Sequence, residues 1–419
     1  MAPQQVGSNE KFKVAFCQTH TSKDKAVSLE NAKAAMAKAL GMGADIILLG
    51  EMFSCPYATK FFREYGERLA PPALQGLLDR AAKSPNEIAF EEVLKCIESA
   101  YTYRAVPFAN GTVSSAAGEN AGSAKVFSVG RLLGLGPEET LLLFGQHYRD
   151  VKDSPSGTSH ANIRAFMQSG WAGIKFPEGL SLTPIETAHA QTVSMMSDFA
   201  RSNKVWIVGG SVPELEGDKV FNTCLVFAPD GGISAKHRKA HLFDIDVAAT
   251  DKRPAMKFKE SDVLSAGEQL TLVDLPWCRA GVGICYDVRF PEYALALRQQ
   301  GAKFLIFPGA FNMTTGPAHW TVLARGRAVD TQSYVALCSP ARSTDPADYQ
   351  AYGHSMLVSP WAEVATEAEH EPGVWISEVD PSEVDRIREQ VPTSYQKRGD
   401  LYAPYAGLDG DAKRPRTKL

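Results

Sequence analysis

The chain has 419 residues, of which 44% are hydrophobic and 22% charged, and its formal net charge is −4, values typical of a soluble globular protein. This length favours two domains or one large domain with an insertion, and the charge gives no general attraction to nucleic acid or to anionic membranes. No apolar run approaches the roughly 18–20 residues of a membrane span, and the N-terminus lacks the apolar core of a signal peptide. The seven cysteines include no CxxC pair, which favours a reducing, cytoplasmic compartment and predicts neither a disulfide framework nor a zinc site.

Residues 11–72 and 181–405 alternate predicted strands with predicted helices. The first segment predicts a strand, then a helix with Ser28 as its N-cap, then a buried apolar strand that ends at Glu51. In the second segment, runs rich in β-branched and aromatic residues predict further strands: KVWIVGGSV, NTCLVFAPDGG, LTLVDLPW, AGVGICYD, KFLIFPGAF, SYVALCSPAR, HSMLVSPWAEV and GVWISEVD. Two helices are predicted among them: PEYALALRQQG and GPAHWTVLARGRAVDTQ. We therefore predict an α/β domain with a large mixed sheet system.

Residues 73–180 interrupt this pattern with predicted helices. IAFEEVLKCIESAY places apolar residues on one helical face, and GPEETLLLFGQHYRDV begins a helix with Pro137 at its first position. A third helix, within TSHANIRAFMQSGW, is predicted to be capped by Thr158 or Ser159. We interpret the segment as an α-rich domain inserted into a loop of the α/β domain, because long insertions into loops cost little closure entropy.

Three residues at predicted strand ends could carry chemistry: Glu51, Lys239 and Cys285. A cysteine acts as a nucleophile when a base takes its proton, a carboxylate can be that base, and a lysine can stabilise an oxyanion. The alternatives from these stretches alone are a packed core thiol at Cys285, a surface acid at Glu51 and a solvated basic turn at Lys239.

Four motifs add a resemblance: LGEMFSCPY, KHRKAHLFDID, GVGICYDVRFPE and PGAFNMTTGPAHW. Together they resemble the nitrilase superfamily of carbon–nitrogen hydrolases, whose pattern is a Glu–Lys–Cys triad. The stretches HLFDID and PGAFNMTTGPAHW resemble its omega-amidase branch, whereas the deaminated-glutathione amidases usually differ there. The resemblance implies a four-layer α-β-β-α sandwich, at least a homodimer, and a small amide substrate with no metal and no organic cofactor.

The resemblance also implies a role for each site residue. Cys285 would attack the amide carbon, and Glu51 would transfer the protons. Lys239 and the backbone N–H of Tyr286 would hold the oxyanion, and Glu260 would orient the lysine and the substrate.

Substrate recognition falls to residues around this group. Arg289 matches the residue that binds the distant carboxylate of the substrate, which suits the two-pronged geometry of a guanidinium. The alternative is a structural ion pair of Arg289 with Glu51 or Asp287. Tyr57 and Thr314 are further candidates for the substrate pocket.

One position departs from the family pattern. Gly50 stands where proline is common, which predicts a looser backbone next to Glu51. The expected reaction is hydrolysis of the terminal amide of 2-oxoglutaramate or 2-oxosuccinamate through a cysteine thioester. The alternatives are another carbon–nitrogen hydrolase, such as a deaminated-glutathione amidase or a carbamoylase, and an inactive scaffold that displays the insert for partner binding.

The insert has a resemblance of its own, to the HopJ family named from bacterial type III effectors. It covers about residues 77–179 and rests on these stretches: PFANG, GENAGSAKVF, LLLFGQHYRDV and GTSHANIRAFMQSGWAGIKF. Several of its residues could form a polar site or serve as helix caps and surface groups: Asn110, His147, His160, Asn162 and Arg164. Three roles are open for the insert: a gate over the pocket, a site for an unknown partner, or a subunit contact.

The chain ends in a polar tail, residues 406–419. Its final Thr-Lys-Leu is similar to a C-terminal peroxisomal address, and a chance basic tail is the alternative.

Overall fold

The computed structural model of the protein describes residues 7–184, 190–251 and 255–402. The polar tail predicted at 406–419, with its final Thr-Lys-Leu, lies outside the described residues. Among the described helices, none is long and apolar enough to cross a membrane.

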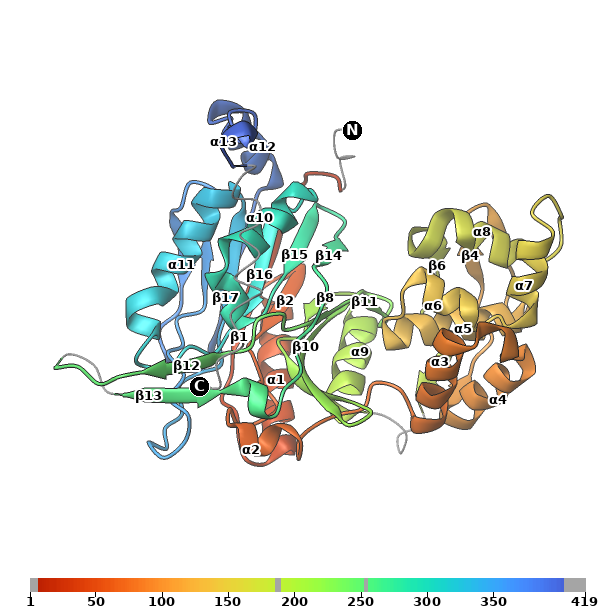
Figure 1. The fold of residues 1–419 in the computed structure, drawn as a ribbon, viewed down its shortest axis with the longest axis horizontal. Helices are drawn as coiled ribbons and strands as arrows, with labels where there is room; N and C mark the ends of the chain where they lie inside the picture. Colours follow the sequence, from red (N-terminus) through yellow and green to blue (C-terminus); the bar gives the residue numbers. More distant parts are fainter. Residues whose placement is uncertain (1–6, 185–189, 252–254, 403–419) are drawn as a thin grey trace.

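Two β-sheets form the centre of the molecule (Figure 1). The first has the order β11-β10-β8-β2-β1-β20, with β9 beside β10. Its strands are β1 (Phe12–Gln18), β2 (Ile46–Leu49), β8 (Trp206–Val208), β9 (Val212–Glu216), β10 (Lys219–Phe227), β11 (Ile233–Arg238) and β20 (Gly373–Val379). The second sheet runs in chain order through β14 (Thr271–Asp274), β15 (Arg279–Val282), β16 (Phe304–Pro308), β17 (Tyr334–Cys338), β18 (Met356–Val358) and β19 (Val364–Glu367).

The strands at the centre of each sheet run parallel to their neighbours. In the first sheet β2 pairs in parallel with β1 and β8, and in the second β16 pairs in parallel with β15 and β17. Every residue of β2 and of β16 is buried. Burial on both faces is typical of parallel strands that lie between layers.

Side chains alternate between two cores along β1. Val14 and Phe16 pack between the sheets together with Val282 of β15, whereas Ala15 and Cys17 pack against the helices outside the first sheet. The outer layers are α1 (Lys25–Gly41) and α9 (Gln191–Asn203) on the first sheet, and α10 (Pro291–Gln299) and α11 (Gly316–Thr331) on the second. This is the four-layer α-β-β-α sandwich implied by the resemblance, and that prediction is confirmed.

Two helices begin at residues other than those predicted. The N-cap of α1 is Asp24, whose carboxylate accepts an amide N–H of the first turn, while Ser28 lies buried inside the helix. The expectation for Ser28 was therefore wrong, because an equally good cap stands one turn earlier. In the insert, α8 (Ala161–Ser169) follows His160, and neither Thr158 nor Ser159 caps it.

The insert folds around its own hydrophobic core, built from residues between Ala70 and Leu182. Its elements are α3 (Pro72–Lys83), α4 (Phe90–Ala100), β3 (Tyr101–Tyr103), β4 (Phe108–Asn110), β5 (Val113–Ser115), α5 (Ala121–Leu133), α6 (Pro137–Leu142), α7 (Gln146–Asp153), α8, β6 (Ile174–Lys175) and β7 (Leu182–Pro184). It lies to one side of the sandwich, where α5 contacts β11 and Arg131 pairs with Asp230 at 3.3 Å (Figure 1).

Smaller elements complete the sandwich: α2 (Thr59–Phe62), β12 (Asp244–Val247), β13 (Met256–Lys259), α12 (Pro381–Gln390) and α13 (Gly399–Tyr402). The antiparallel pair β12–β13 projects from the region between Lys239 and Glu260 (Figure 1).

Candidate active site

The two sheets bring three strand ends to one buried place. Glu51 follows β2, Lys239 follows β11 directly, and Cys285 follows β15 after a short extended stretch. Glu51 and Lys239 are fully buried, and Cys285 is 5% exposed. Residues far apart in the chain therefore share one site, which spacing alone could not show.

Lys239 lies between two carboxylates. Its Nζ is 3.0 Å from Oε1 of Glu51 and 2.9 Å from Oε1 of Glu260. All three side chains are fully buried. A solvated basic turn, the alternative for Lys239, is therefore excluded, since this ammonium has no contact with solvent.

Backbone and side-chain donors orient the two carboxylates. Oε2 of Glu51 accepts the backbone N–H of Ala310 at 2.8 Å, and its Oε1 accepts the amide of Asn222 at 2.8 Å. The Tyr57 hydroxyl lies 2.9 Å from Oε1 of Glu260 and 3.3 Å from Oε1 of Glu51. Tyr57 thus contacts both carboxylates of the charged group, whereas the sequence predicted only that it lines the substrate pocket.

Burial and charge set the protonation of this group. Burial raises the pKa of Glu51, and the Glu260 charge adds to that effect, although the Lys239 ammonium opposes both. Burial alone would lower the pKa of Lys239, but the charges of Glu260 and Glu51 outweigh it and raise the pKa well above its ordinary value. Burial and the Glu51 charge raise the pKa of Cys285, so its thiol keeps its proton near neutral pH. A neutral thiol next to a basic carboxylate needs that carboxylate to become a nucleophile.

Cys285 has an unusual backbone conformation. It begins a 3-10 helix, Cys285–Arg289, with a φ of 47°, in the left-handed region that residues other than glycine rarely adopt. Strain of this kind persists where the surroundings fix it, and it is frequent at functional sites. No feature of the sequence predicted it.

Asp287 holds this turn in place from the buried side. Its carboxylate accepts the backbone N–H of Ile284 at 2.8 Å and contacts ring nitrogens of His237 at 3.0 Å and His241 at 2.8 Å. Burial raises the pKa of Asp287, but the hydrogen bonds from the two histidines outweigh it and hold the pKa well below its usual range. From the sequence, Asp287 was expected only as a possible partner of Arg289.

Arg289 lies near Cys285 without an ion pair to either predicted acid among the described residues. Its Nη1 is 3.2 Å from Nδ1 of His319, and its guanidinium stacks over Phe311 at 4.8 Å. Its Nε is buried and has no hydrogen-bond partner among the described residues. The side chain therefore keeps an unused donor, and the structural ion pair with Glu51 or Asp287 is absent there.

The ring contacts of Tyr286 and the hydrogen bonds of Thr314 among the described residues do not include Glu51, Lys239 or Glu260. The Tyr286 ring packs against the ring of Phe243, with 5.1 Å between the ring centroids, so the side chain has a structural role. The backbone N–H of Tyr286 is the group expected to bind the oxyanion. Thr314 lies in the loop before α11, where its amide donates to Asn312 at 2.9 Å. The hydrogen bonds around Glu51 do not include it.

A cavity of about 200 Å³ reaches Glu51 from solvent and is lined by Tyr57 and Tyr349 among others. The rings of these tyrosines lie 4.6 Å apart, and the Tyr349 hydroxyl donates to the carbonyl of Ala310 at 2.5 Å. Sequence reasoning missed Tyr349 because no motif surrounds it. No residue of the insert lines this cavity, so a gate over the pocket has no contact to support it among the described residues.

Gly50 has no room for a side chain. A Cβ at this position would lie 2.5 Å from the backbone N of Pro340 and 2.7 Å from the carbonyl carbon of Ser339. The glycine therefore permits the segment after β17 to approach the residue before Glu51. This close contact, not the expected looseness, is its structural effect.

Comparison with known proteins places these features in a family. The carbon-nitrogen hydrolase family model matches residues 162–389, more than half of the chain, and the HopJ type III effector protein model matches residues 74–180. The two matches overlap over residues 162–180, which include most of α8. Ile163, Phe166 and Phe176 pack in the core of the insert, so we assign this stretch to the insert.

Individual relatives confirm the resemblance to the nitrilase superfamily and to its omega-amidase branch, and the matching family model confirms the HopJ resemblance. The chain is 40% identical to the omega-amidase NIT2 of Danio rerio over 63% of this chain and 96% of the relative. It is 47% identical to the omega-amidase NIT2 of Homo sapiens over 59% and 86%, respectively. The structure of Saccharomyces cerevisiae Nit3, a member of branch 10 of the nitrilase superfamily, aligns with a TM-score of 0.58 and 28% identity over 94% of this chain and 99% of the other. The chain therefore belongs to the carbon–nitrogen hydrolase family and carries a HopJ-like segment within it.

Proposed function

We propose that the protein is an omega-amidase, which hydrolyses the terminal amide of a small dicarboxylate monoamide such as 2-oxoglutaramate or 2-oxosuccinamate. The observation that carries the proposal is the buried Glu51–Lys239–Cys285 group beside an arginine whose Nε is unpaired. The names of the relatives, which are omega-amidases at 40–47% identity, support the same activity.

In the first half of the reaction, the thiol of Cys285 gives its proton to Glu51 as the sulfur attacks the amide carbon. The oxygen of the amide then carries negative charge, which Lys239 and the backbone N–H of Tyr286 stabilise. Glu51 passes the proton to the nitrogen, the C–N bond breaks, and ammonia leaves a thioester on Cys285. The raised pKa of Glu51 suits a group that must both accept and donate this proton.

In the second half, a water molecule replaces ammonia. Glu51 takes a proton from the water, and the resulting hydroxide attacks the thioester carbon. The C–S bond breaks, the product acid leaves, and the proton returns to the sulfur. Glu260 holds Lys239 in place throughout, because it shares the ammonium with Glu51 and its own Oε2 is fixed by the backbone N–H of Phe243 at 2.7 Å.

Arg289 would select substrates that carry a carboxylate. The buried Nε of Arg289 gains a hydrogen-bond partner when a carboxylate binds. Burial lowers the pKa of Arg289, and the negative charge of the bound carboxylate would offset that effect on the pKa. Tyr57 lines the cavity at Glu51, and Thr314 is a further candidate contact on the loop before α11.

We also propose that the protein acts as a homodimer or larger homo-oligomer. Helix α11 exposes Val322 and Val329, and Trp361 is exposed on the segment bonded to α11 through Arg325. A set of exposed apolar side chains on one helical face favours contact with a second copy.

Ammonia release from 2-oxoglutaramate and from succinamate tests the activity. Cys285→Ala should abolish turnover, since no other group supplies the nucleophile, while Cys96→Ala in the insert should leave it unchanged. Turnover that persists in Cys285→Ala would contradict the mechanism. Hydrolysis of a carbamoyl or glutathione-derived amide, with none of the dicarboxylate monoamides, would instead favour another reaction of the family.

The role of Arg289 needs a pair of substrates. Arg289→Gln should raise KM at least about 10-fold for succinamate but not for butyramide, which lacks the carboxylate, because one charge-assisted contact is worth roughly 1.5–3 kcal/mol. Arg279→Gln, which removes a surface ion pair with Asp274, is the matched control. Equal losses on both amides would show that Arg289 supports the fold and does not select the substrate.

A further inference from the structure

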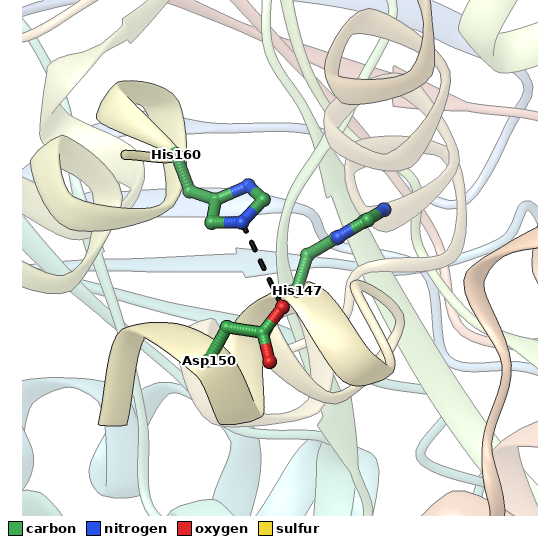
Figure 2. A group of neighbouring side chains, drawn as sticks. All are labelled: His147, Asp150 and His160. Atoms are coloured by element: carbon green, nitrogen blue, oxygen red, sulfur yellow. Dashed lines mark ion pairs between the residues drawn. The ribbon is translucent and has the colours of Figure 1, made fainter. Parts of the chain in front are cut away.

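The insert carries a cluster of metal-ligating side chains that the proposed amidase does not use. His147 and Asp150 stand one turn apart on α7, and His160 directly precedes α8. Their ligand atoms all lie within 4.8 Å of one another, and among the described residues this is the one such group of three histidine, cysteine or acidic side chains. Figure 2 shows the imidazole of His160 facing the carboxylate of Asp150 across the space between the two helices, with His147 beside them.

The distances suit closure around an ion. Nε2 of His160 is 3.8 Å from Oδ2 of Asp150, and the rings of His147 and His160 are 4.8 Å apart. Ligands of a tetrahedral zinc ion sit about 2.0–2.2 Å from the metal, which places them roughly 3–3.5 Å from each other. Side-chain rotations that move each ligand atom by about 1 Å would therefore bring the three donors into coordination, without movement of the helices.

The loop before His160 is fixed by a side chain of the insert. The guanidinium of Arg164 donates to the carbonyl oxygens of Ser159 at 2.7 Å, Pro155 at 3.0 Å and Ser154 at 2.8 Å. His160 itself has a left-handed backbone, with a φ of 56°, which aims its ring back toward α7. Arg164 is thus a positioning residue, not a member of the polar site expected from the sequence.

Helix α7 is fixed as firmly on the other side. Arg149 donates to the carbonyl oxygens of Pro85 at 2.9 Å and Ile88 at 3.1 Å, and the side chain of Gln146 accepts the backbone N–H of Phe90 at 2.8 Å. The ring of Phe90 meets the ring of His147 edge-on at 5.0 Å. Helix α7 and the residue before α8, which supply the ligands, are therefore held before any ion binds, and this lowers the entropic cost of binding.

A cavity borders the cluster. It has a volume of about 280 Å³, and its lining includes the two histidines together with Phe90, Phe144, Asn120 and Asn162. Two imidazoles and one carboxylate suit a divalent transition-metal ion, and three protein ligands leave a coordination position for water or a small ligand. The aromatic and amide side chains around that position would contact such a ligand.

We propose that His147, Asp150 and His160 form a divalent metal site, of the zinc type, with one coordination position open to this cavity. The site lies in the HopJ-like segment and is separate from the Glu51–Lys239–Cys285 group. It gives the insert a ligand of its own, which neither the hydrolase family nor the cysteine pattern of the sequence predicts.

Titration of the full-length, metal-stripped protein with Zn²⁺ tests the proposal. The experiment uses a Cys285→Ala background, so that the active-site thiol does not take up metal. We expect one equivalent to bind, with an absorption spectrum of tetrahedral or five-coordinate geometry when Co²⁺ replaces Zn²⁺. His160→Ala and, separately, Asp150→Asn should weaken binding more than about 10-fold, since even outer-shell partners of a metal cost 10–100-fold.

Controls separate binding from folding. His370→Ala removes a half-exposed histidine that pairs with Glu371 outside the insert, and it should leave affinity and stoichiometry unchanged. Asp150→Asn preserves shape, so its metal-free melting temperature should match that of the parent, and only the parent should melt higher when Zn²⁺ is added. The proposal is overturned if the parent binds no ion, or if His147→Ala/His160→Ala binds Zn²⁺ with the stoichiometry and affinity of the parent.

Discussion

The contact of Gly50 with the segment after β17 connects a single residue to the position of the proposed base. A Cβ on residue 50 would approach the backbone of Ser339 and Pro340, and backbone atoms cannot move aside as a flexible side chain can. The carbonyl of Gly50 also accepts the backbone N–H of Ser211 at 3.3 Å. Any shift of residue 50 would thus be transmitted directly to Glu51.

We predict that Gly50→Ala lowers the free energy of unfolding by about 1–3 kcal/mol, the usual cost of overpacking, and reduces kcat of amide hydrolysis. Thermal or urea denaturation and ammonia release measure the two effects. Gly326→Ala is the matched control, because a Cβ there meets no atom within 4 Å and alanine favours the interior of α11. A Gly50→Ala protein as stable and active as the parent would show that the segment at Pro340 can give way.

At the scale of elements, the 3-10 helix that begins at Cys285 depends on Asp287. This carboxylate connects the turn to β11 through His237 and to the following loop through His241, whose backbone N–H it also accepts at 2.9 Å. The turn is therefore connected to the strand that directly precedes Lys239. The nucleophile and the lysine are placed by one hydrogen-bonded network.

Replacement of Asp287 by asparagine should destabilise the fold by about 3–5 kcal/mol at neutral pH, the range for breaking a buried charged pair. The pKa of Asp287 is lower in the folded state than in the unfolded state, where it is about 4. The stabilisation that the carboxylate gives the fold is therefore complete above about pH 4 and is lost as the pH falls below that value. The difference in stability between the parent and Asp287→Asn should therefore shrink below about pH 4. Denaturation curves across acidic pH check this, with the exposed Asp274→Asn as a control whose difference stays small throughout.

Sequence patterns located the elements better than their ends. The apolar runs around Ile46–Leu49 and Phe304–Pro308 predicted strands, the first of them buried, and both strands are present and buried, because burial on two faces leaves a clear pattern. Ser28 was predicted as the N-cap of α1, but the cap is Asp24; the sequence could not distinguish them, since both residue types cap helices equally well.

The candidate site was predictable only where a motif marked it. Glu51 and Lys239 stand in family motifs, and they lie together with Glu260, whose role the resemblance also implied. Asn222 and Tyr349 contact the same group from distant parts of the chain, with nothing in their own neighbourhoods to mark them. The left-handed backbone of Cys285 depends on tertiary contacts and leaves no trace in sequence.

At the scale of the whole molecule, the insert leaves and re-enters the sandwich at one place. The backbone of Glu67 forms an isolated β-bridge with Glu214 of β9, and the Glu67 carboxylate accepts the backbone N–H of Thr192 in α9 at 3.1 Å. The two connections are therefore adjacent, and a core of its own fills the insert between them. We propose that residues 73–180 fold as a separate domain.

Deletion of the insert should leave the hydrolase intact. A variant that joins residue 70 to residue 190 through a short glycine–serine linker should keep kcat/KM for 2-oxoglutaramate and its oligomer size by light scattering, because no insert residue lines the cavity at Glu51 in the described structure. Arg131→Ala in the full chain is the control, since it removes the ion pair between insert and sandwich and a cation–π contact inside the insert but leaves the insert in place. A loss of kcat/KM of about 10-fold or more, equal to about 1.4 kcal/mol, would assign the insert a part in catalysis.

The sharing of one ammonium by two carboxylates bears on how the reaction ends. On the proposed chemistry, hydrolysis turns a neutral amide into a carboxylic acid, which becomes an anion once it loses its proton. That anion forms beside Glu51 and Glu260, whose only buried counter-charge is Lys239 among the described hydrogen-bonded partners. Like charges a few Å apart repel strongly where water is excluded. That repulsion arises only after the C–N bond is cleaved, so the same pocket retains the amide and releases the acid. Product departure then needs no moving lid.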